Sequence, residues 1–361
     1  MAVVGHWANL AEAQKLTQSV LLSGVIDTVI QEGQLLPMMG VKMLRGKSLL
    51  YNREKSFTAG TASNFRSIHE QIPWTADVEY DQVEVALKII SEARAVDKFI
   101  SATYSNINDY EATVMQEVIK RVVYFVEDRL LYGDTTYTNT KEFDGLHAIN
   151  AGLETPTNAG ADAEDKVNIN GGEVVLSLSD VRRLLDACRV DQLGRNNVAL
   201  LMGPVLARRF DQAYQEAGFV LSGVTVSQSS YTIGARELGG RISFFDGIPI
   251  IRTNFLGAEV ANTGTGSSSD ARGKFVTGTR NYSLFVVRFG NTEDGGLEML
   301  FGDPGVNDGE FKPFFHERFD KLEDYLAGGH RISGFMAPAL GAPQGLGRIF
   351  DITDGPILPT R

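Results

Sequence analysis

The clearest hydrophobic pattern in the chain lies between residues 108 and 133. Apolar side chains recur there at three- and four-residue spacing, the period of a helix that buries one face: Val114, Val118, Val122 and Phe125. The polar positions assigned to its wetter faces are Gln116, Glu117, Lys120, Arg121, Glu127 and Asp128. Asn108 and Glu111 can form a capping pair at the start, and Gly133 stands where a left-handed helix end is expected. The pattern predicts a helix over about 109–132, about 36 Å long at ~1.5 Å per residue.

A second helical stripe occupies the first forty residues. Its apolar positions are Leu10, Ala13, Leu16, Val20, Leu21, Val25 and Val29, and it ends near Gly33. A stripe this apolar needs a partner, which is either the rest of its own chain or a neighbouring chain.

Residues 48–74 read as an extended hairpin, with the flank 48–57, a turn at 59–64 and a returning flank at 65–74. A two-stranded hairpin is barely stable alone in water, so we expect this one to lie on another surface. A strand follows, with Val83, Val85, Leu87 and Ile89 inward and Gln82, Glu84 and Lys88 outward. It leads through 95–104 into the long helix.

Residues 150–173 are rich in Gly, Ala, Asn, Thr and Asp and mark a domain boundary. Beyond it we expect a helix at about 179–190, a strand at 198–202, and a helix that starts at Pro204 and ends before Gly218, with Phe210 and Tyr214 on one face. A turn at 246–247 then precedes a strand at 248–254. The runs 283–290 and 296–300 are predicted to form a strand pair.

Length and composition narrow the class of protein. A chain of 361 residues favours two subdomains, and its single cysteine, Cys188, excludes an internal disulfide. The spacing of Cys188 from Val181, Leu184 and Leu185 predicts a core thiol. The net charge of −11 argues against a protein that binds nucleic acid over its whole surface. No apolar run reaches the ~18 residues of a membrane span and no secretory signal is present, so we expect synthesis in the cytosol.

Two loops could be candidates for binding phosphate or calcium, but neither has the residue spacing that such a site requires. The loop 264–274 lacks the glycine and hydroxyl of a phosphate-binding loop, because Ser268 and Phe275 occupy those positions. The acidic run that begins at Asp303 has Asp308 where a calcium loop requires glycine and Phe314 where it requires a carboxylate.

No other motif indicates catalysis. The histidines His6, His69, His147, His316 and His330 show no zinc-binding spacing, and no Gly-x-Ser-x-Gly elbow is present. We therefore predict no catalytic, cofactor or metal site. A catalytic triad assembled from scattered residues would escape this search, so an enzyme stays open as an alternative.

The stretch 126–134 followed by Phe143-Asp144-Gly145-Leu146 resembles the spine helix and following turn of tailed-bacteriophage major capsid proteins with the Hong Kong 97 fold. Gly247-Ile248-Pro249-Ile250 resembles a recurrent strand of their axial domain. The resemblance covers roughly residues 8–335. It implies an α+β fold divided as follows: N-terminal arm 1–44, E-loop hairpin 45–78, peripheral domain with the spine helix 79–173, axial domain with a mixed sheet and flanking helices 174–285, and return segment to the peripheral domain 286–334. The remainder, 335–361, departs from the family pattern and is taken as a C-terminal extension of unassigned role.

The function that the resemblance implies is structural: self-assembly into the icosahedral head shell of a tailed phage around double-stranded DNA, without catalysis or cofactors. The expected inter-subunit contacts lie on the arm and the hairpin: Leu16, Val20, Tyr51, Arg53, Glu54, Lys55, Phe57, Phe65 and Trp74. Some capsids of this fold join a lysine to an asparagine between subunits; Lys47 and Lys55 are conceivable donors, but no pairing signal distinguishes them from solvated lysines.

The expected partners are further copies of the chain in hexamers and pentamers, a portal protein, and packaged DNA held only non-specifically; no membrane partner is expected. A separate scaffolding protein is also expected, because the arm helix begins within about ten residues of Met1. Whether a decoration protein binds is open. The expected location is the virion, after assembly in the host cytoplasm. The alternatives are an encapsulin-type nanocompartment shell protein and a cytosolic α/β enzyme.

Overall fold

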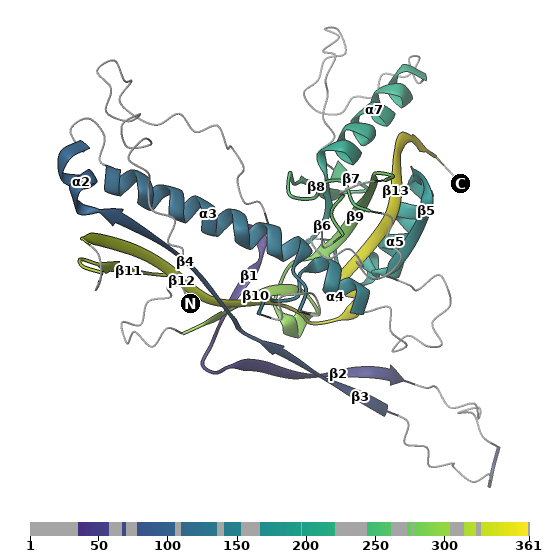
Figure 1. Ribbon diagram of the computed structural model, residues 1–361. Coiled ribbons are helices and arrows are strands. Elements are labelled where there is room, and N and C mark those ends of the chain that lie inside the picture. Colours follow the sequence, from purple (N-terminus) through teal and green to yellow (C-terminus); the bar gives the residue numbers. More distant parts are fainter. Residues whose placement is uncertain are drawn as a thin grey trace.

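The computed structural model describes residues 35–57, 67–69, 78–104, 110–135, 141–152, 167–195, 197–220, 244–260, 273–275, 278–303, 314–322 and 326–359. It has an α+β architecture: one long helix lies along a first sheet, a second sheet carries its own helices, and a hairpin projects from the first sheet (Figure 1). The predicted arm helix and the Asn108 cap lie outside the described residues.

The helices are α2 Lys98–Tyr104, α3 Tyr110–Tyr132, α4 Leu146–Gly152, α5 Leu178–Ala187, α6 Val190–Leu193 and α7 Pro204–Val220, with short 3₁₀ turns η1 Leu36–Met38, η4 Thr292–Asp294 and η5 Pro343–Gly345. The strands are β1 Gly40–Leu44, β2 Ser48–Phe57, β3 Val78–Ala86, β4 Lys88–Asp97, β5 Asn168–Ser177, β6 Val198–Met202, β7 Phe244–Phe245, β8 Ile248–Arg252, β9 Asn281–Arg288, β10 Leu297–Gly302, β11 Phe315–Phe319, β12 Ala327–Leu340 and β13 Leu346–Leu358.

The long helix α3 matches its predicted span and packs on β4 and β12 of a five-stranded sheet, whose order is β1-β10-β12-β11 with β4 also paired to β12. Its buried stripe repeats every four residues: Val114, Val118, Val122, Val126 and Leu130. The prediction was wrong for Phe125, which is 40% exposed, because the stripe continues from Val122 to Val126.

Glu127 also departs from its prediction, since this carboxylate is fully buried. It accepts hydrogen bonds from the backbone N–H groups of Leu35 (3.1 Å) and Leu36 (2.9 Å). Burial raises the pKa of Glu127, and the N–H groups of Leu36 and Leu35 partly offset this rise. The segment before β1 is thus bonded to the C-terminal half of the long helix α3.

Gly133 ends α3 as predicted, but for a different reason. Its φ is not positive. A Cβ here would lie 2.4 Å from the Phe143 carbonyl oxygen and 2.6 Å from that of Arg129. The Gly145 N–H donates to the Gly133 carbonyl (2.8 Å), so the turn at 143–146 folds tightly against the helix end. The glycine is required by close backbone packing.

The second sheet has six strands in the order β5-β13-β9-β6-β8-β7, and its inner strands β9 and β6 are buried on both faces. Ala199 and Leu201 of β6 face the core shared with α3, whereas Leu200 and Met202 face the core under α5 and α7. A strand covered on both sides reads as a continuous apolar run, which explains the sequence at 198–202. This strand was predicted with the observed bounds.

The helices of this second unit differ in detail from the predictions. The expected helix at 179–190 is divided into α5 and α6, because Arg189 is left-handed with φ 49°. Helix α7 continues past Gly218, and Tyr214 is 62% exposed although Phe210 is buried. Cys188 is buried as predicted, and burial raises the pKa of its thiol to about 12.

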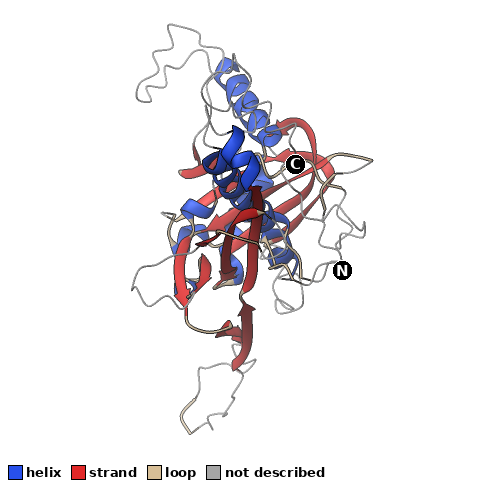
Figure 2. Ribbon diagram, turned by 60° about the vertical axis from the view of Figure 1, so that its left-hand side comes forward, coloured by secondary structure: helices blue, strands red, loops and turns tan. Residues whose placement is uncertain are grey.

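Strands β2 and β3 form a hairpin whose first strand matches the predicted flank 48–57, and it points away from the rest of the molecule in two views (Figures 1 and 2). The single strand expected from Val83 to Ile89 is instead two: β3 pairs with β2, and β4 pairs with β12. Ile89 is 72% exposed and Ile90 is buried, because the alternation slips by one residue where the chain passes from the hairpin into the sheet. The expected return flank at 65–74 is described only at 67–69, an exposed turn.

The C-terminal residues correct the prediction of an extension. Strand β12 is the hub of the five-stranded sheet and β13 lies between β5 and β9 in the six-stranded sheet, so the part of 335–361 up to Leu358 contributes to both cores. The runs 283–290 and 296–300 form strands as predicted, but they do not form a ladder with each other and meet at the isolated bridge between Phe289 and Leu297. β9 pairs with β6 and β13, whereas β10 pairs with β1 and β12.

Candidate functional site

The hairpin has two distinct faces. Leu49, Tyr51, Val83 and Val85 are half-buried on the inner face, and Leu50 and Tyr80 are 55% and 71% exposed on the outer face. Polar residues Asn52, Gln82 and Glu84 complete the exposed face. Exposed apolar and aromatic side chains on a projecting strand pair are typical of surfaces that contact another protein.

Tyr51 and Arg53, two of the predicted contact residues, bond to their own chain. The Tyr51 hydroxyl donates to the Leu340 carbonyl at 2.6 Å, and Arg53 Nη2 donates to the same oxygen at 2.8 Å. Arg53 Nη2 also donates to the Tyr51 hydroxyl at 3.0 Å. The structure therefore brings these two side chains together on Leu340, and their contact with a neighbour stays a prediction.

The other predicted contact residues are placed less fully. Glu54, Lys55 and Phe57 belong to β2, but their side chains lie outside the described part of the chain. Leu16, Val20, Phe65 and Trp74 are outside the described residues altogether.

Further apolar side chains are exposed on the first unit and were not singled out from the sequence. Val41 and Met43 of β1 are 50% and 40% exposed, and among the described strands β1 pairs only with β10, which makes it an edge strand. Phe99 of α2 is 60% exposed, and Ile119 of α3 is 44% exposed. An open edge beside exposed apolar residues is available for contact with a second chain. The available sequence signal was the alternation of Val41 and Met43.

A charged network lies inside the molecule where α3, α4, β9 and β13 meet. Glu259 Oε1 is 2.7 Å from His147 Nε2 and accepts from the Tyr132 hydroxyl at 3.1 Å. Its other oxygen accepts from Arg348 Nη2 at 3.0 Å and from the Ser283 hydroxyl. The His147 ring stacks on Tyr132 with centroids 4.4 Å apart. Sequence reasoning missed this network because its members are up to 216 residues apart, from Tyr132 to Arg348.

The electrostatics of this network favour an ionised carboxylate. Burial alone would raise the pKa of Glu259, but the charges and hydrogen bonds of His147, Arg348 and Ser283 outweigh burial and lower it to about 2. Burial and the adjacent Glu259 raise the pKa of Tyr132 well above its ordinary value. The carboxylate is fully buried and committed to these partners, so its role is to join the long helix to the second sheet.

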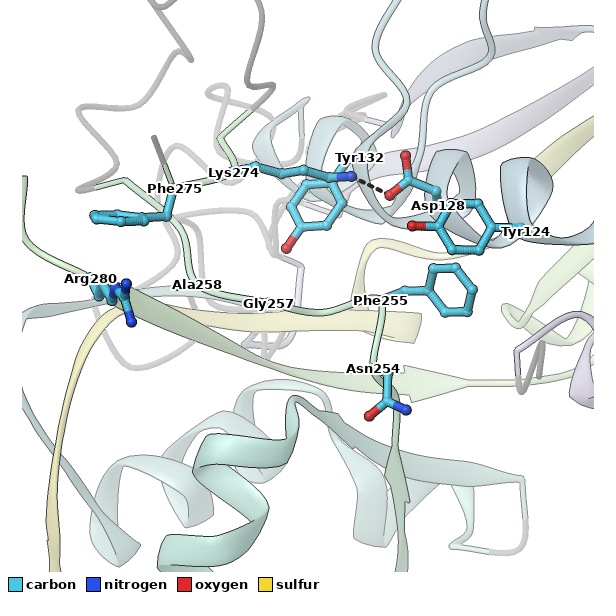
Figure 3. Close-up of a pocket in the computed structure, with 10 residues that line it drawn as sticks. All are labelled: Tyr124, Asp128, Tyr132, Asn254, Phe255, Gly257, Ala258, Lys274, Phe275 and Arg280. Atoms are coloured by element: carbon cyan, nitrogen blue, oxygen red, sulfur yellow. Dashed lines mark hydrogen bonds and ion pairs between the residues drawn. The ribbon is translucent and has the colours of Figure 1, made fainter. Parts of the chain in front are cut away.

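A pocket of about 430 Å³ lies beside the network, between α3 and the segment that follows β8 (Figure 3). Lys274 pairs with Asp128 across it and lies over the Tyr132 ring, 4.9 Å from the centroid. Arg280 stacks on Phe275 at 4.9 Å.

The described residues contain no group of three or more His, Cys, Asp or Glu side chains placed to hold a metal. None of the described helices is both long and apolar enough to cross a membrane.

A long helix on a five-stranded sheet, a second sheet with its own helices and a projecting hairpin together define the Hong Kong 97 class of shell-protein folds. Among similar solved structures, the capsid of cyanophage A-1(L) matches with a TM-score of 0.62 and 13% identity, over 94% of this chain and 98% of that one. The SrpI encapsulin of Synechococcus elongatus PCC 7942 matches with a TM-score of 0.59 and 13% identity, over 98% and 99% of the two chains. The capsid of a native GTA particle matches with a TM-score of 0.55 and 13% identity, over 92% and 93%.

The sequence matches no protein-family model and no curated protein, so structure alone carries the likeness. At these identities the shared property is the fold. The chain has the Hong Kong 97 fold over nearly its whole length, which confirms the α+β fold class and the resemblance predicted from residues 126–134 and 143–146.

Proposed function

We propose that this protein is the major capsid protein of a tailed bacteriophage, the repeating subunit of an icosahedral shell around double-stranded DNA. The observation that carries the proposal is the match of nearly the whole chain to capsid subunits, including the cyanophage A-1(L) capsid. The projecting hairpin and the edge strand β1 supply the lateral surfaces that a shell subunit needs.

In this proposal the protein acts through the shape and contacts of its repeated subunits and carries out no reaction. Closed symmetry uses the same surface patches in every copy, so many weak contacts add up to a stable shell. The arm residues Leu16 and Val20 and the outer hairpin carry contacts beyond a flat edge. The partners are further copies in hexamers and pentamers, a portal protein, a separate scaffolding protein and, where present, a decoration protein. Assembly takes place in the host cytoplasm and the product is the virion.

The net charge of −11 suits a container for DNA. A strongly cationic inner surface would bind phosphate tightly along its whole length, whereas a weakly interacting wall lets a long duplex be packed and later released. DNA is therefore held by confinement, without specific contacts.

Electron microscopy of the purified protein over a concentration and salt series tests the proposal. We expect curved assemblies, rings or closed particles at high concentration, because the hairpin and β1 expose apolar surface. A monomer at every concentration and salt would contradict a shell function.

The second candidate is an encapsulin-type nanocompartment, favoured by the match to SrpI over 98% of this chain. The contents of particles isolated from the natural source separate the two. Nuclease-protected double-stranded DNA supports the capsid, whereas a packaged cargo enzyme supports the compartment.

A further inference from the structure

The hairpin is attached to the body by few described contacts. Its two strands pair only with each other among the described strands. At its root, the Leu87 N–H donates to the Lys47 carbonyl at 3.0 Å, and the partly buried side chains of Val85 and Leu87 pack on the core. Such a strand pair can swing about its root unless something holds it farther out.

Both strands have a suitable hinge at this root. Gly46 precedes β2 with φ +151°, and no atom lies within 4 Å of the place where a Cβ would be. On the other strand, Leu87 lies in the break between β3 and β4. A few residues at element ends that absorb changes in φ and ψ are sufficient for a hinge motion.

Tyr51 and Arg53 hold the hairpin beyond this hinge. They lie three and five residues from the first pair of the ladder, Ser48 and Ala86, or about 10 and 17 Å along the strand. Both side chains donate to the Leu340 carbonyl, at 2.6 and 2.8 Å. These two hydrogen bonds, called the tie below, act farther from the hinge than the contacts at the root. They therefore fix the angle of the hairpin more firmly than those contacts do.

The acceptor belongs to a rigid part of the molecule. Leu340 is the last residue of β12 and is 2% exposed. The next residue, Gly341, donates to the Gly296 carbonyl at 3.0 Å, and a Cβ on it would lie 2.0 Å from the Thr292 carbonyl oxygen. Since β13 begins at Leu346, the carbonyl lies where the chain passes from the five-stranded to the six-stranded sheet.

The tie is also limited in strength. Arg53 Nε is buried without a hydrogen-bond partner among the described residues. An unsatisfied buried donor opposes the closed arrangement, so the two bonds to Leu340 are partly offset. A tie of this kind can open when a competing contact forms on the hairpin.

We propose that Tyr51 and Arg53 are positioning residues that set the angle between the hairpin and the body by holding the Leu340 carbonyl, and that this angle determines the curvature of the shell. The second half of the statement rests on the proposed shell function. The partner in this contact is the subunit's own backbone, and the outer hairpin face stays available to the neighbour.

Distance measurements between two spin labels test the tie in unassembled full-length subunits. Labels at Tyr80→Cys on the hairpin and Asp294→Cys in η4 are both at exposed positions, and the buried Cys188 stays unlabelled. With the tie intact we expect one narrow distance distribution. The double variant Tyr51→Phe/Arg53→Met should broaden it by several ångströms, because Tyr80 is six residues, on the order of 20 Å, from the root at Ala86.

Matched variants separate positioning from general damage. Asn52→Ala/Gln82→Ala alters the exposed face at the same level of the hairpin and should leave the distribution narrow. Arg53→Lys keeps one donor and should broaden it less than Arg53→Met does. Tyr51→Phe alone, which removes a single hydroxyl, serves if the double variant does not fold. An unchanged distribution in the folded double variant would overturn the tie.

Shell diameters measured by electron microscopy test the link to curvature. Under identical conditions the double variant should give a wider spread of diameters than the wild type, whereas Asn52→Ala/Gln82→Ala should not. A broadened label distance with unchanged diameters would overturn the link to curvature. If the wild-type chain stays a monomer at every concentration and salt, the proposed function and the link to curvature both fail, while the label distances still decide whether the tie exists.

Discussion

Arg348 and Glu259 form an ion pair inside the molecule, with Nη2 and Oε2 3.0 Å apart and side chains only 5% and 4% exposed. The pair connects β13 to the segment that follows β8, and through His147 and Tyr132 it reaches the end of the long helix. Burying two charges is costly unless they stay paired, so the value of this contact depends on keeping both members.

Replacing Glu259 by Gln should destabilise the unassembled subunit by about 3–5 kcal/mol, because Arg348 is then left buried without a counter-charge. Urea unfolding followed by circular dichroism measures the loss. The matched control is Glu317→Gln, which breaks an ion pair with Arg331 whose side chains are 41% and 45% exposed. This control should cost less than about 1 kcal/mol. Equal losses in the two variants would contradict a special role for the buried pair.

The stability of the subunit should also depend on acid through Glu259. Its pKa is lowered from 4.5 to about 2 in the fold. A lowered pKa stabilises the fold above the unfolded value and loses this effect as pH falls from about 4.5 toward 2. The full loss is about 3 kcal/mol at 1.36 kcal/mol per pKa unit. Unfolding free energies at pH 5 and at pH 3 should therefore differ less in Glu259→Gln than in the wild type.

Gly133→Ala should destabilise the subunit by about 1–3 kcal/mol, the usual cost of forcing atoms into a packed site. The new methyl group would meet the carbonyl oxygens of Phe143 and Arg129 at 2.4 and 2.6 Å. Gly257→Ala is the control, because no atom lies within 4 Å of its Cβ position. Thermal unfolding of both variants measures the difference. A neutral Gly133→Ala would mean that the 143–146 turn can move away from the helix end.

Replacing residues 56–66 by a short Gly-Ser link should abolish regular shells while leaving the melting temperature of the subunit nearly unchanged. The described base of the hairpin, with Tyr51, Arg53 and Val85, stays in place, so the body keeps its contacts. Calorimetry and electron microscopy of the same preparation measure both properties. An unfolded subunit would show that the removed residues belong to the core.

Local sequence patterns predicted the helices and strands that have a clear hydrophobic pattern or that follow recognisable turn residues. The helix α3, the strand β6 and the turn Asp246-Gly247 before β8 were read correctly, since helical periodicity, a continuous apolar run and turn residues with positive φ each have a local physical cause. The hairpin was expected, but its second strand was assigned to the wrong residues. Its partner could not be identified, because β2 and β3 are separated by a long intervening segment.

The sequence did not predict the strand pairings and contacts between residues that are far apart in the chain. Strand β12 contains Gly328, Gly329, Gly334 and Pro338, which weaken any strand signal, yet neighbours on both sides hold it extended. The burial of Glu127 likewise depends on the N–H groups of Leu35 and Leu36, 92 and 91 residues away. Charged residues on a helix are usually solvated, and only the fold reveals such an exception.

The positions of β12 at the hub of the first sheet and of β13 inside the second have a consequence for synthesis. A ribosome makes residues 327–358 after all the strands that pair with them, so neither sheet can be completed until this last stretch has left the exit tunnel. Completion of both sheets is therefore delayed until residues 327–358 are available to pair with strands made much earlier. A product of premature termination before residue 327 lacks the central strand of the first sheet and an internal strand of the second. Such a product can complete neither sheet, so we expect it to stay unfolded and open to proteolysis.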